Sequence, residues 1–122
     1  MRILIVEDSP LVMKMYGMVF PPREHVLDHA ANGREALRRL AESTQAYDVI
    51  LLDLRMPDMN GAEFIAEVRK QGGRPSRIPI VLTTAEPEDS PLLQQAQSMG
   101  VAAIVRKPWK PQGLRDAVLL AI

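Results

Sequence analysis

Short apolar runs rich in β-branched residues recur along the chain, and each is followed by a stretch with helical spacing. Four strong runs lie at Ile3–Val6, Val49–Leu52, Ile78–Leu82 and Val101–Val105, with a weaker one at Val26–Ala31. Such runs predict β-strands. Because the strong runs are continuously apolar rather than alternating, they predict a parallel sheet covered on both faces.

The segments between the runs carry helix start and stop signals. The starts are expected at Ser9-Pro10, Asn32, Asn60, about Asp89 and Pro111. The ends are expected at Pro21-Pro22, before Gly72-Gly73 and at Gly100. Five strands alternating with five helices predict one α/β domain over residues 1–122.

Composition agrees with one globular domain and excludes several classes. The chain has 122 residues, 47% of them apolar and 25% charged, which is long enough for a real core. Lys+Arg and Asp+Glu are balanced at 15 each, so no basic field indicates nucleic-acid binding. There is no Cys, and the first apolar run is too short for a signal or membrane segment. We therefore expect a cytoplasmic protein.

The candidate chemistry follows the strands, because ligands of open parallel sheets bind at the carboxyl ends of strands. The residues delivered there are Glu7-Asp8, Asp53, Thr83-Thr84 and Lys107. Each alone has an ordinary explanation: acids cap helices and turns, Thr suits strands, and a single Lys is usually a surface residue. Their arrival at one edge from four strands makes a functional site the better interpretation.

Three converging acids have an energetic consequence. Two carboxylates about 4 Å apart repel by roughly 4 kcal/mol at an effective dielectric constant of 20. Glu7, Asp8 and Asp53 therefore need a cation or a proton, and Mg²⁺ suits such a site. A Lys and a Thr hydroxyl suit phosphoryl oxygens. The chain has no glycine-rich phosphate loop, so a phosphoryl group carried by Asp53 fits better than a bound nucleotide.

Five segments in order, "ILIVEDS", "NGREAL", "DVILLDLRMPDMNG", "IPIVLTTA" and "VRKPW", give the chain its family resemblance. The chain resembles response regulator receiver domains, the phosphoacceptor modules of two-component signalling, over essentially all its residues. The resemblance implies a doubly wound (βα)₅ flavodoxin-like fold with strand order 2-1-3-4-5.

The resemblance also implies a metal site that holds Mg²⁺ (or Mn²⁺). Asp53, the residue that accepts the phosphoryl group, and Asp8 match direct ligands. The backbone carbonyl of Arg55 matches the third protein ligand, and Glu7 matches an acid that acts through water.

Two further residues match the family's phosphoryl-binding groups. Thr83 and Thr84 are both candidates for the switch hydroxyl, and Thr84 matches better because a small residue, Ala85, follows it. Lys107 matches the lysine that pairs with the phosphoryl group, and the Lys107–Pro108 bond is expected to be cis.

The implied function is a signalling switch. The phosphoryl group would come from a histidine kinase or histidine phosphotransfer protein, and the output would be a downstream protein or a fused output domain, with a homodimer as a further option. No membrane or nucleic-acid contact through this domain is expected. The domain would catalyse only its own phosphorylation and dephosphorylation.

Two alternatives are weaker. A Mg²⁺-dependent aspartyl-phosphate hydrolase needs an acid two residues after its nucleophile, where this chain has Arg55. A degenerate receiver that only binds partners would not be expected to keep all five site residues.

Four positions depart from the family pattern or add to it. Ile104 stands where the family commonly has an aromatic residue, which puts the aromatic part of the switch in doubt. Trp109 is expected to be a packing residue. Arg55 and Glu86 flank the phosphoacceptor and the switch hydroxyl, and we hypothesise a salt bridge between them that shields the site.

The first predicted helix is unusually apolar. Its apolar residues are Leu11, Val12, Met13, Met15, Tyr16, Met18, Val19 and Phe20. Part of this surface is either exposed for partner docking or buried under a covering loop, and the sequence leaves both open.

Overall fold

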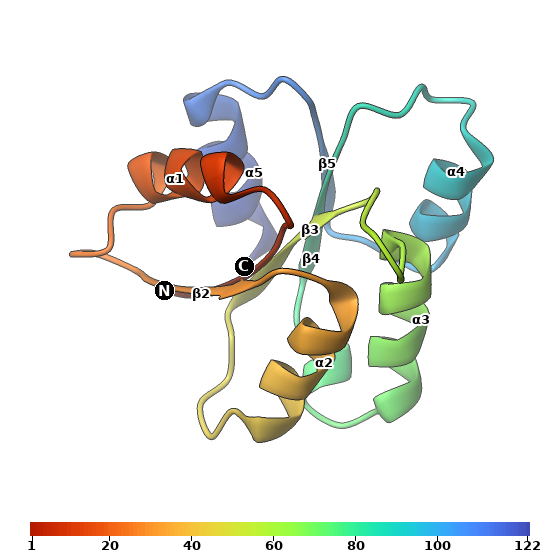
Figure 1. Ribbon diagram of the computed structural model, residues 1–122, viewed down its shortest axis with the longest axis horizontal. Helices are drawn as coiled ribbons and strands as arrows, with labels where there is room; N and C mark the ends of the chain where they lie inside the picture. Colours follow the sequence, from red (N-terminus) through yellow and green to blue (C-terminus); the bar gives the residue numbers. More distant parts are fainter.

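The structure, a computed structural model, describes all 122 residues as one parallel sheet with helices on both faces (Figure 1). The strands are β1 (Arg2–Val6), β2 (Val26–Ala30), β3 (Val49–Asp53), β4 (Ile80–Thr84) and β5 (Ala103–Arg106). The helices are α1 (Pro10–Val19), α2 (Gly33–Glu42), α3 (Gly61–Gln71), α4 (Pro91–Ser98) and α5 (Pro111–Ala121). The strand order is β2-β1-β3-β4-β5, which confirms the predicted fold.

Every helix except α5 begins where a side chain accepts a free backbone N–H group of the first turn. The side chain of Ser9 accepts from Val12 N, and that of Asn32 accepts from Glu35 N. Asn60 forms a reciprocal capping box with Glu63. Each of these caps was predicted from the sequence.

The core has two layers, one on each side of the sheet. α1 and α5 cover one face, and α2, α3 and α4 cover the other (Figure 1). β3 and β4 are buried throughout, and β1 is buried after its first residue. β5 is only half-buried because it lies at the edge of the sheet, so the expectation of two-sided burial holds for the central strands alone.

Some element bounds differ from the expectations. β4 begins at Ile80 rather than Ile78, because Pro79 has no N–H to donate to a neighbouring strand and a short 3₁₀ helix, η1 (Pro75–Arg77), precedes it. α4 begins at Pro91, and Ser90 rather than Asp89 caps it.

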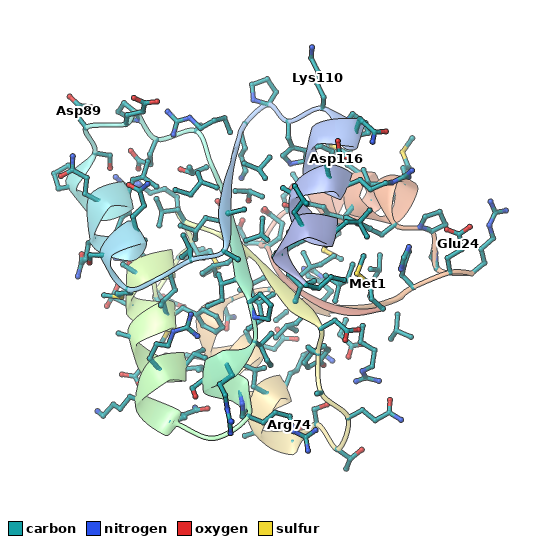
Figure 2. The ribbon with its side chains drawn as sticks, turned by 180° about the vertical axis from the view of Figure 1, so that it is seen from behind. Met1, Glu24, Arg74, Asp89, Lys110 and Asp116 are labelled. Atoms are coloured by element: carbon teal, nitrogen blue, oxygen red, sulfur yellow. The ribbon has the colours of Figure 1, made fainter.

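The loops that follow the strands share one end of the molecule. Figure 2 shows Asp89 and Lys110, which precede α4 and α5, at the end opposite Arg74, which precedes β4. The carboxyl ends of the strands therefore form a single edge, where the candidate residues were expected. None of the helices combines the length and the apolar character that a membrane span needs.

Candidate functional site

Three acids meet at the carboxyl edge of the sheet. Glu7 and Asp8 directly follow β1, and Asp53 is the last residue of β3, which pairs with β1. One carboxylate oxygen from each lies within 4.8 Å of the others. Glu7 is 2% exposed and Asp53 is 8% exposed, whereas Asp8 is open to solvent. The predicted convergence of the three acids is thus present.

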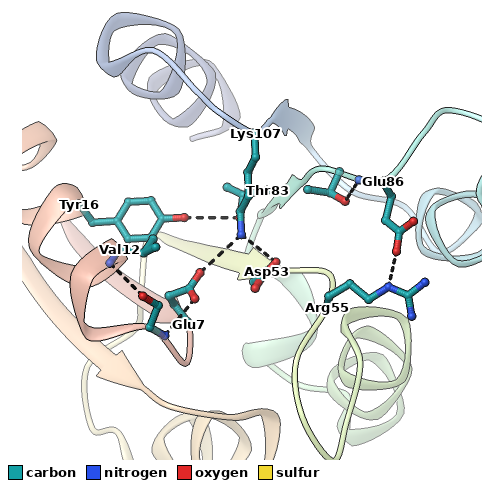
Figure 3. Close-up of polar contacts among 10 residues, drawn as sticks. Glu7, Val12, Tyr16, Asp53, Arg55, Thr83, Glu86 and Lys107 are labelled. Atoms are coloured by element: carbon teal, nitrogen blue, oxygen red, sulfur yellow. Dashed lines mark hydrogen bonds and ion pairs between the residues drawn. The ribbon is translucent and has the colours of Figure 1, made fainter.

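Lys107 reaches this cluster from the end of β5. Its Nζ lies 3.1 Å from Asp53 Oδ1 and 3.8 Å from Glu7 Oε2, as the close-up in Figure 3 shows. The Lys107–Pro108 peptide bond is cis, as the resemblance implied. One ammonium group therefore faces two buried carboxylates.

Thr83 and Thr84 point to different surroundings. Thr83 Oγ1 accepts a hydrogen bond from the Tyr16 hydroxyl at 3.4 Å, while Thr84 Oγ1 accepts one from Glu86 N at 2.9 Å. A hollow of about 330 Å³ adjoins Asp53, and its lining residues are Asp53, Arg55, Thr84, Ala85, Glu86 and Lys107. Only Thr84 of the two threonines lines it, which supports the choice of Thr84 as the candidate switch hydroxyl.

The hypothesised salt bridge is present at the rim of this hollow. Arg55 Nε pairs with Glu86 Oε1 across the hollow from Lys107 (Figure 3). The Arg55 side chain is 71% exposed and that of Glu86 is 15% exposed. The pair can therefore limit the approach of water without being part of the core.

The electrostatics of the cluster leave negative charge uncompensated. Burial raises the pKa of Asp53, although Lys107 opposes the shift. Burial and then the charge of Asp53 raise the pKa of Glu7. In both residues the folded structure disfavours the charged carboxylate.

The residues present fit a hard divalent cation. Glu7 Oε2 is buried and has no hydrogen-bond partner, so an acceptor is available and unused. Asp8 presents its carboxylate to solvent beside it. Oxygen ligands from carboxylates, with an open side for water, are what Mg²⁺ prefers.

Two residues that hold the site in place were not identified from the sequence. His29 Nε2 lies 2.6 Å from the backbone carbonyl of Glu7, across the β1–β2 pair. Tyr16 is 1% exposed, and its hydroxyl reaches Thr83 beneath the cluster. The one feature of the sequence that could have pointed to Tyr16 was its hydroxyl group among the apolar residues of the first helix.

Trp109 and the first helix can also be compared with expectation. The Trp109 ring stacks on that of Tyr16, with centroids 5.3 Å apart, which confirms Trp109 as a packing residue.

Leu11 and Met18 on α1 are 68% and 80% exposed, and Met15 is 41% exposed. The apolar surface of α1 is therefore partly open to solvent rather than covered by a loop.

Comparison with known proteins agrees with this geometry. The family model described as "Response regulator receiver domain" matches residues 3–119. A protein-glutamate methylesterase/protein-glutamine glutaminase of Treponema denticola is 38% identical over 110 residues, covering 88% of this chain and 28% of that protein. The transcriptional regulatory protein ResD of Bacillus subtilis is 31% identical, covering 97% and 45%. The chain thus spans less than half the length of these relatives.

Solved structures show the same fold. The chemotaxis protein CheY4 of Vibrio cholerae superposes with a TM-score of 0.85 at 30% identity, covering 99% of this chain and 98% of that one. The receiver domain of the sensor histidine kinase PA1611 of Pseudomonas aeruginosa, solved with a magnesium ion in its active site cleft, gives 0.85 at 26% identity, covering 98% and 95%. With a family match that runs from the first strand into the last helix, the chain belongs to the response regulator receiver domains of two-component systems.

Proposed function

We propose that the chain is a phosphorylation-dependent signalling switch in which Asp53 accepts a phosphoryl group. The observation that carries the proposal is the position of Asp53. It ends a buried strand, contacts Lys107 at 3.1 Å, lies among three acids, and opens onto a hollow of about 330 Å³. The donor is a phosphohistidine on a histidine kinase or histidine phosphotransfer protein, the partners with which receiver domains of this family interact.

Asp8, Asp53 and the backbone carbonyl of Arg55 would hold Mg²⁺ (or Mn²⁺), with Glu7 acting through water. Glu7 Oε2, which has no hydrogen-bond partner and only a 3.8 Å ion pair with Lys107, and the shared position of the three carboxylates support this set. A bound Mg²⁺ supplies positive charge for the acidic cluster and for phosphoryl oxygens.

In the phosphorylation step, an Asp53 oxygen attacks the phosphorus atom in line with the leaving imidazole nitrogen. The new O–P bond makes an acyl phosphate, while the P–N bond breaks, its electron pair stays on the imidazole nitrogen, and that nitrogen takes up a proton from water. Lys107 Nζ, already beside Asp53 Oδ1, can pair with an equatorial oxygen of the transferring group. The protein thus contributes positioning and charge.

Thr84 is placed to sense the new group. Its hydroxyl faces the hollow and bonds Glu86 N in this structure. If the Thr84 hydroxyl turned to donate its proton to a phosphoryl oxygen, it would draw the β4–α4 loop inward, which shifts the population between two conformations. Because Ile104 replaces the family's common aromatic residue, we assign the switch to the hydroxyl and the loop alone.

The signal ends when water hydrolyses the acyl phosphate. The Arg55–Glu86 pair borders the hollow through which water must arrive. The same pair argues against a phosphohydrolase that turns over substrates. Such an enzyme needs an acid two residues after Asp53, where this chain has Arg55, which forms an ion pair with Glu86.

The output is a protein–protein contact, made either with a separate target or with a fused output domain. The phosphoryl donor docks where the exposed apolar side chains of α1, Leu11, Met15 and Met18, lie. A cytoplasmic location and a homodimer stay predictions.

The proposal is tested by incubating the protein with Mg²⁺ and acetyl phosphate and measuring its intact mass. We expect a gain of one phosphoryl group in the wild type and in Asp58→Asn, and none in Asp53→Asn. Asp58 is a matched control because it is exposed and has a positive φ, which Asn tolerates. The absence of any gain in the wild type would contradict the proposed function.

A further inference from the structure

Tyr16 on α1 contacts two segments next to the proposed site, the end of β4 and the turn after β5. Its hydroxyl donates to Thr83 Oγ1 at 3.4 Å, and its ring stacks on Trp109 with an interplanar angle of 19°. Figure 3 shows the Tyr16 hydroxyl directed at Thr83. The side chain is almost completely buried, so both contacts are shielded from water.

Both contacts of Tyr16 lead to close neighbours of site residues. Thr83 is paired in register with Asp53, so it lies beside the phosphoacceptor on the same face of the sheet. Trp109 comes two residues after Lys107, at the far side of Pro108. One side chain of α1 therefore touches the neighbour of Asp53 and the turn that carries Lys107.

The Lys107–Trp109 turn has little other support on its outer side. A mostly apolar groove of about 350 Å³ opens there between α1 and the turn. Its lining residues are Val12, Met15, Ala85, Lys107, Pro108 and Trp109. The stack on Tyr16 supports the Trp109 ring from the inner side, while the groove leaves the turn open to solvent.

We propose that Tyr16 is a positioning residue for Lys107. Its ring fixes Trp109, and through Trp109 it fixes the backbone from which the long, flexible Lys107 side chain reaches Asp53. Displacing a group at a reacting centre by even a fraction of an ångström lowers the rate of a transfer step. The inference rests on the proposed function of Asp53, but it concerns a residue outside the family's set of site residues.

The buried hydroxyl is consistent with this role. An apolar side chain could fill the same space without the cost of burying a polar group. Burial, together with the nearby charges of Glu7 and Asp53, raises the pKa of Tyr16 to about 12. The hydroxyl therefore stays neutral and remains a donor to Thr83.

Two variants separate the ring from the hydroxyl. Tyr16→Leu removes the stack, and Tyr16→Phe keeps it. An aromatic pair contributes enough that losing it changes a rate by up to about ten-fold. We expect Tyr16→Leu to slow phosphorylation by acetyl phosphate and Mg²⁺ by roughly that factor, and Tyr16→Phe by no more than about two-fold. Val19→Ala, which changes a buried residue one turn later on α1, controls for loss of core packing.

A double-mutant comparison shows whether Tyr16 acts through Lys107. If it does, Tyr16→Leu has no further effect on the residual rate of Lys107→Ala. A full roughly ten-fold loss in that background, or a loss in Val19→Ala as large as in Tyr16→Leu, would overturn the inference.

A second measurement does not depend on phosphorylation. The ¹³C NMR signal of Lys107 Cε, assigned by its loss in Lys107→Ala, reports the position of the lysine directly. We expect Tyr16→Leu to shift this signal, and Tyr16→Phe and Val19→Ala to leave it in place. An unchanged signal in Tyr16→Leu contradicts the inference even if Asp53 is phosphorylated. A shifted signal supports it even if the wild type gains no phosphoryl group and the proposed function fails.

Discussion

The two ends of the sheet carry polar clusters that differ in how their charges are matched. At the amino end, the Arg2 guanidinium pairs with Asp28 at 3.8 Å, donates to Gln45 at 2.7 Å and lies over the Tyr47 ring. The Tyr47 hydroxyl donates to Asp28 at 2.5 Å. Arg2 Nε and the nearby Arg39 Nε are the buried nitrogens there without a hydrogen-bond partner. In this cluster the carboxylate of Asp28 is paired with a cation and accepts a hydrogen bond, and a second carboxylate, Asp48, accepts from the backbone N–H of Arg2.

At the carboxyl end, one ammonium group faces an excess of negative charge. Glu7, Asp8 and Asp53 gather within 4.8 Å, and a buried carboxylate oxygen of Glu7 has no donor. Like charges held together are unfavourable unless something else binds them. The comparison leads us to expect that the amino-end cluster stabilises the fold, whereas the carboxyl-end cluster lowers stability in return for the proposed binding and reaction.

The largest expected effect comes from removing the one cation of the carboxyl edge. Lys107→Ala leaves the charge on the transferring phosphoryl group without its protein partner. We expect phosphorylation of Asp53 by acetyl phosphate to slow by about 10²-fold, measured by intact mass over time. Lys110→Ala is the control. Lys110 is exposed, and its side chain makes no capping hydrogen bond to α5, so this variant should be phosphorylated at the wild-type rate. Equal rates in the wild type and Lys107→Ala would show that Lys107 has no part in the transfer.

The amino-end cluster should respond in stability and not in chemistry. Tyr47→Phe removes the donor to the Asp28 carboxylate, and a hydrogen bond to a charged group contributes about 1.5 kcal/mol. We expect the free energy of unfolding in urea to fall by about that amount, with phosphorylation unchanged. If Tyr47→Phe were as stable as the wild type but became phosphorylated more slowly, the amino-end cluster would affect the chemistry rather than the stability, and the contrast between the two ends of the sheet would be wrong.

The carboxyl edge should gain stability when it loses a charge. The folded pKa of Asp53 is raised, so the folded state is favoured by protonation. Without Mg²⁺, the contribution of Asp53 to stability is therefore greatest below the ordinary carboxyl pKa and is lost as pH rises through the raised one. We expect Asp53→Asn to unfold at a higher temperature than the wild type at neutral pH, by on the order of 1 kcal/mol or about 4 °C.

The same experiment with added Mg²⁺ sharpens the result. Mg²⁺ should raise the melting temperature of the wild type more than that of Asp53→Asn, because the variant offers one fewer anionic ligand. If Asp53→Asn were less stable than the wild type without metal, the carboxyl edge would not be a region of unfavourable charge.

The smallest expected effect concerns the rim of the hollow. Arg55→Ala removes the pair with Glu86 but leaves the backbone carbonyl of residue 55 in place. Exposed ion pairs contribute little, so we expect dephosphorylation to become about three-fold faster. Arg74→Ala, which changes an arginine at the opposite end of the molecule, is the control. If the phosphorylated form of Arg55→Ala decayed at the wild-type rate, the shielding hypothesis would be wrong.

Much of the fold could be predicted because it is encoded locally. The apolar runs predicted every strand, and the caps at Ser9, Asn32 and Asn60 predicted three helix starts. The convergence of the acids followed from the rule that the carboxyl ends of parallel strands share an edge. The errors were in element bounds: α4 begins at Pro91 and β5 at Ala103, each about two residues later than expected, and β4 begins at Ile80 because proline and a 3₁₀ turn take up the preceding residues.

Contacts between distant side chains could not be predicted in the same way. Tyr16 and Thr83 are 67 residues apart, and their hydrogen bond depends on the helix rotation and rotamers that packing selects. The sequence pattern predicted only that α1 has an apolar side. Likewise, the choice between Thr83 and Thr84 rested on family resemblance until their neighbours, Tyr16 and Glu86, could be identified.

The central claim is that the acidic cluster at the carboxyl edge of the sheet binds a divalent cation and that Asp53 within it accepts a phosphoryl group. The most direct test is to phosphorylate the protein with acetyl phosphate and Mg²⁺, digest it, and locate the added group by mass spectrometry of the peptides. We expect the group on Asp53, within residues 48–61, and no modification when Mg²⁺ is removed by a chelator. A phosphoryl group on any other residue, or one that forms equally well without a divalent cation, would contradict this account.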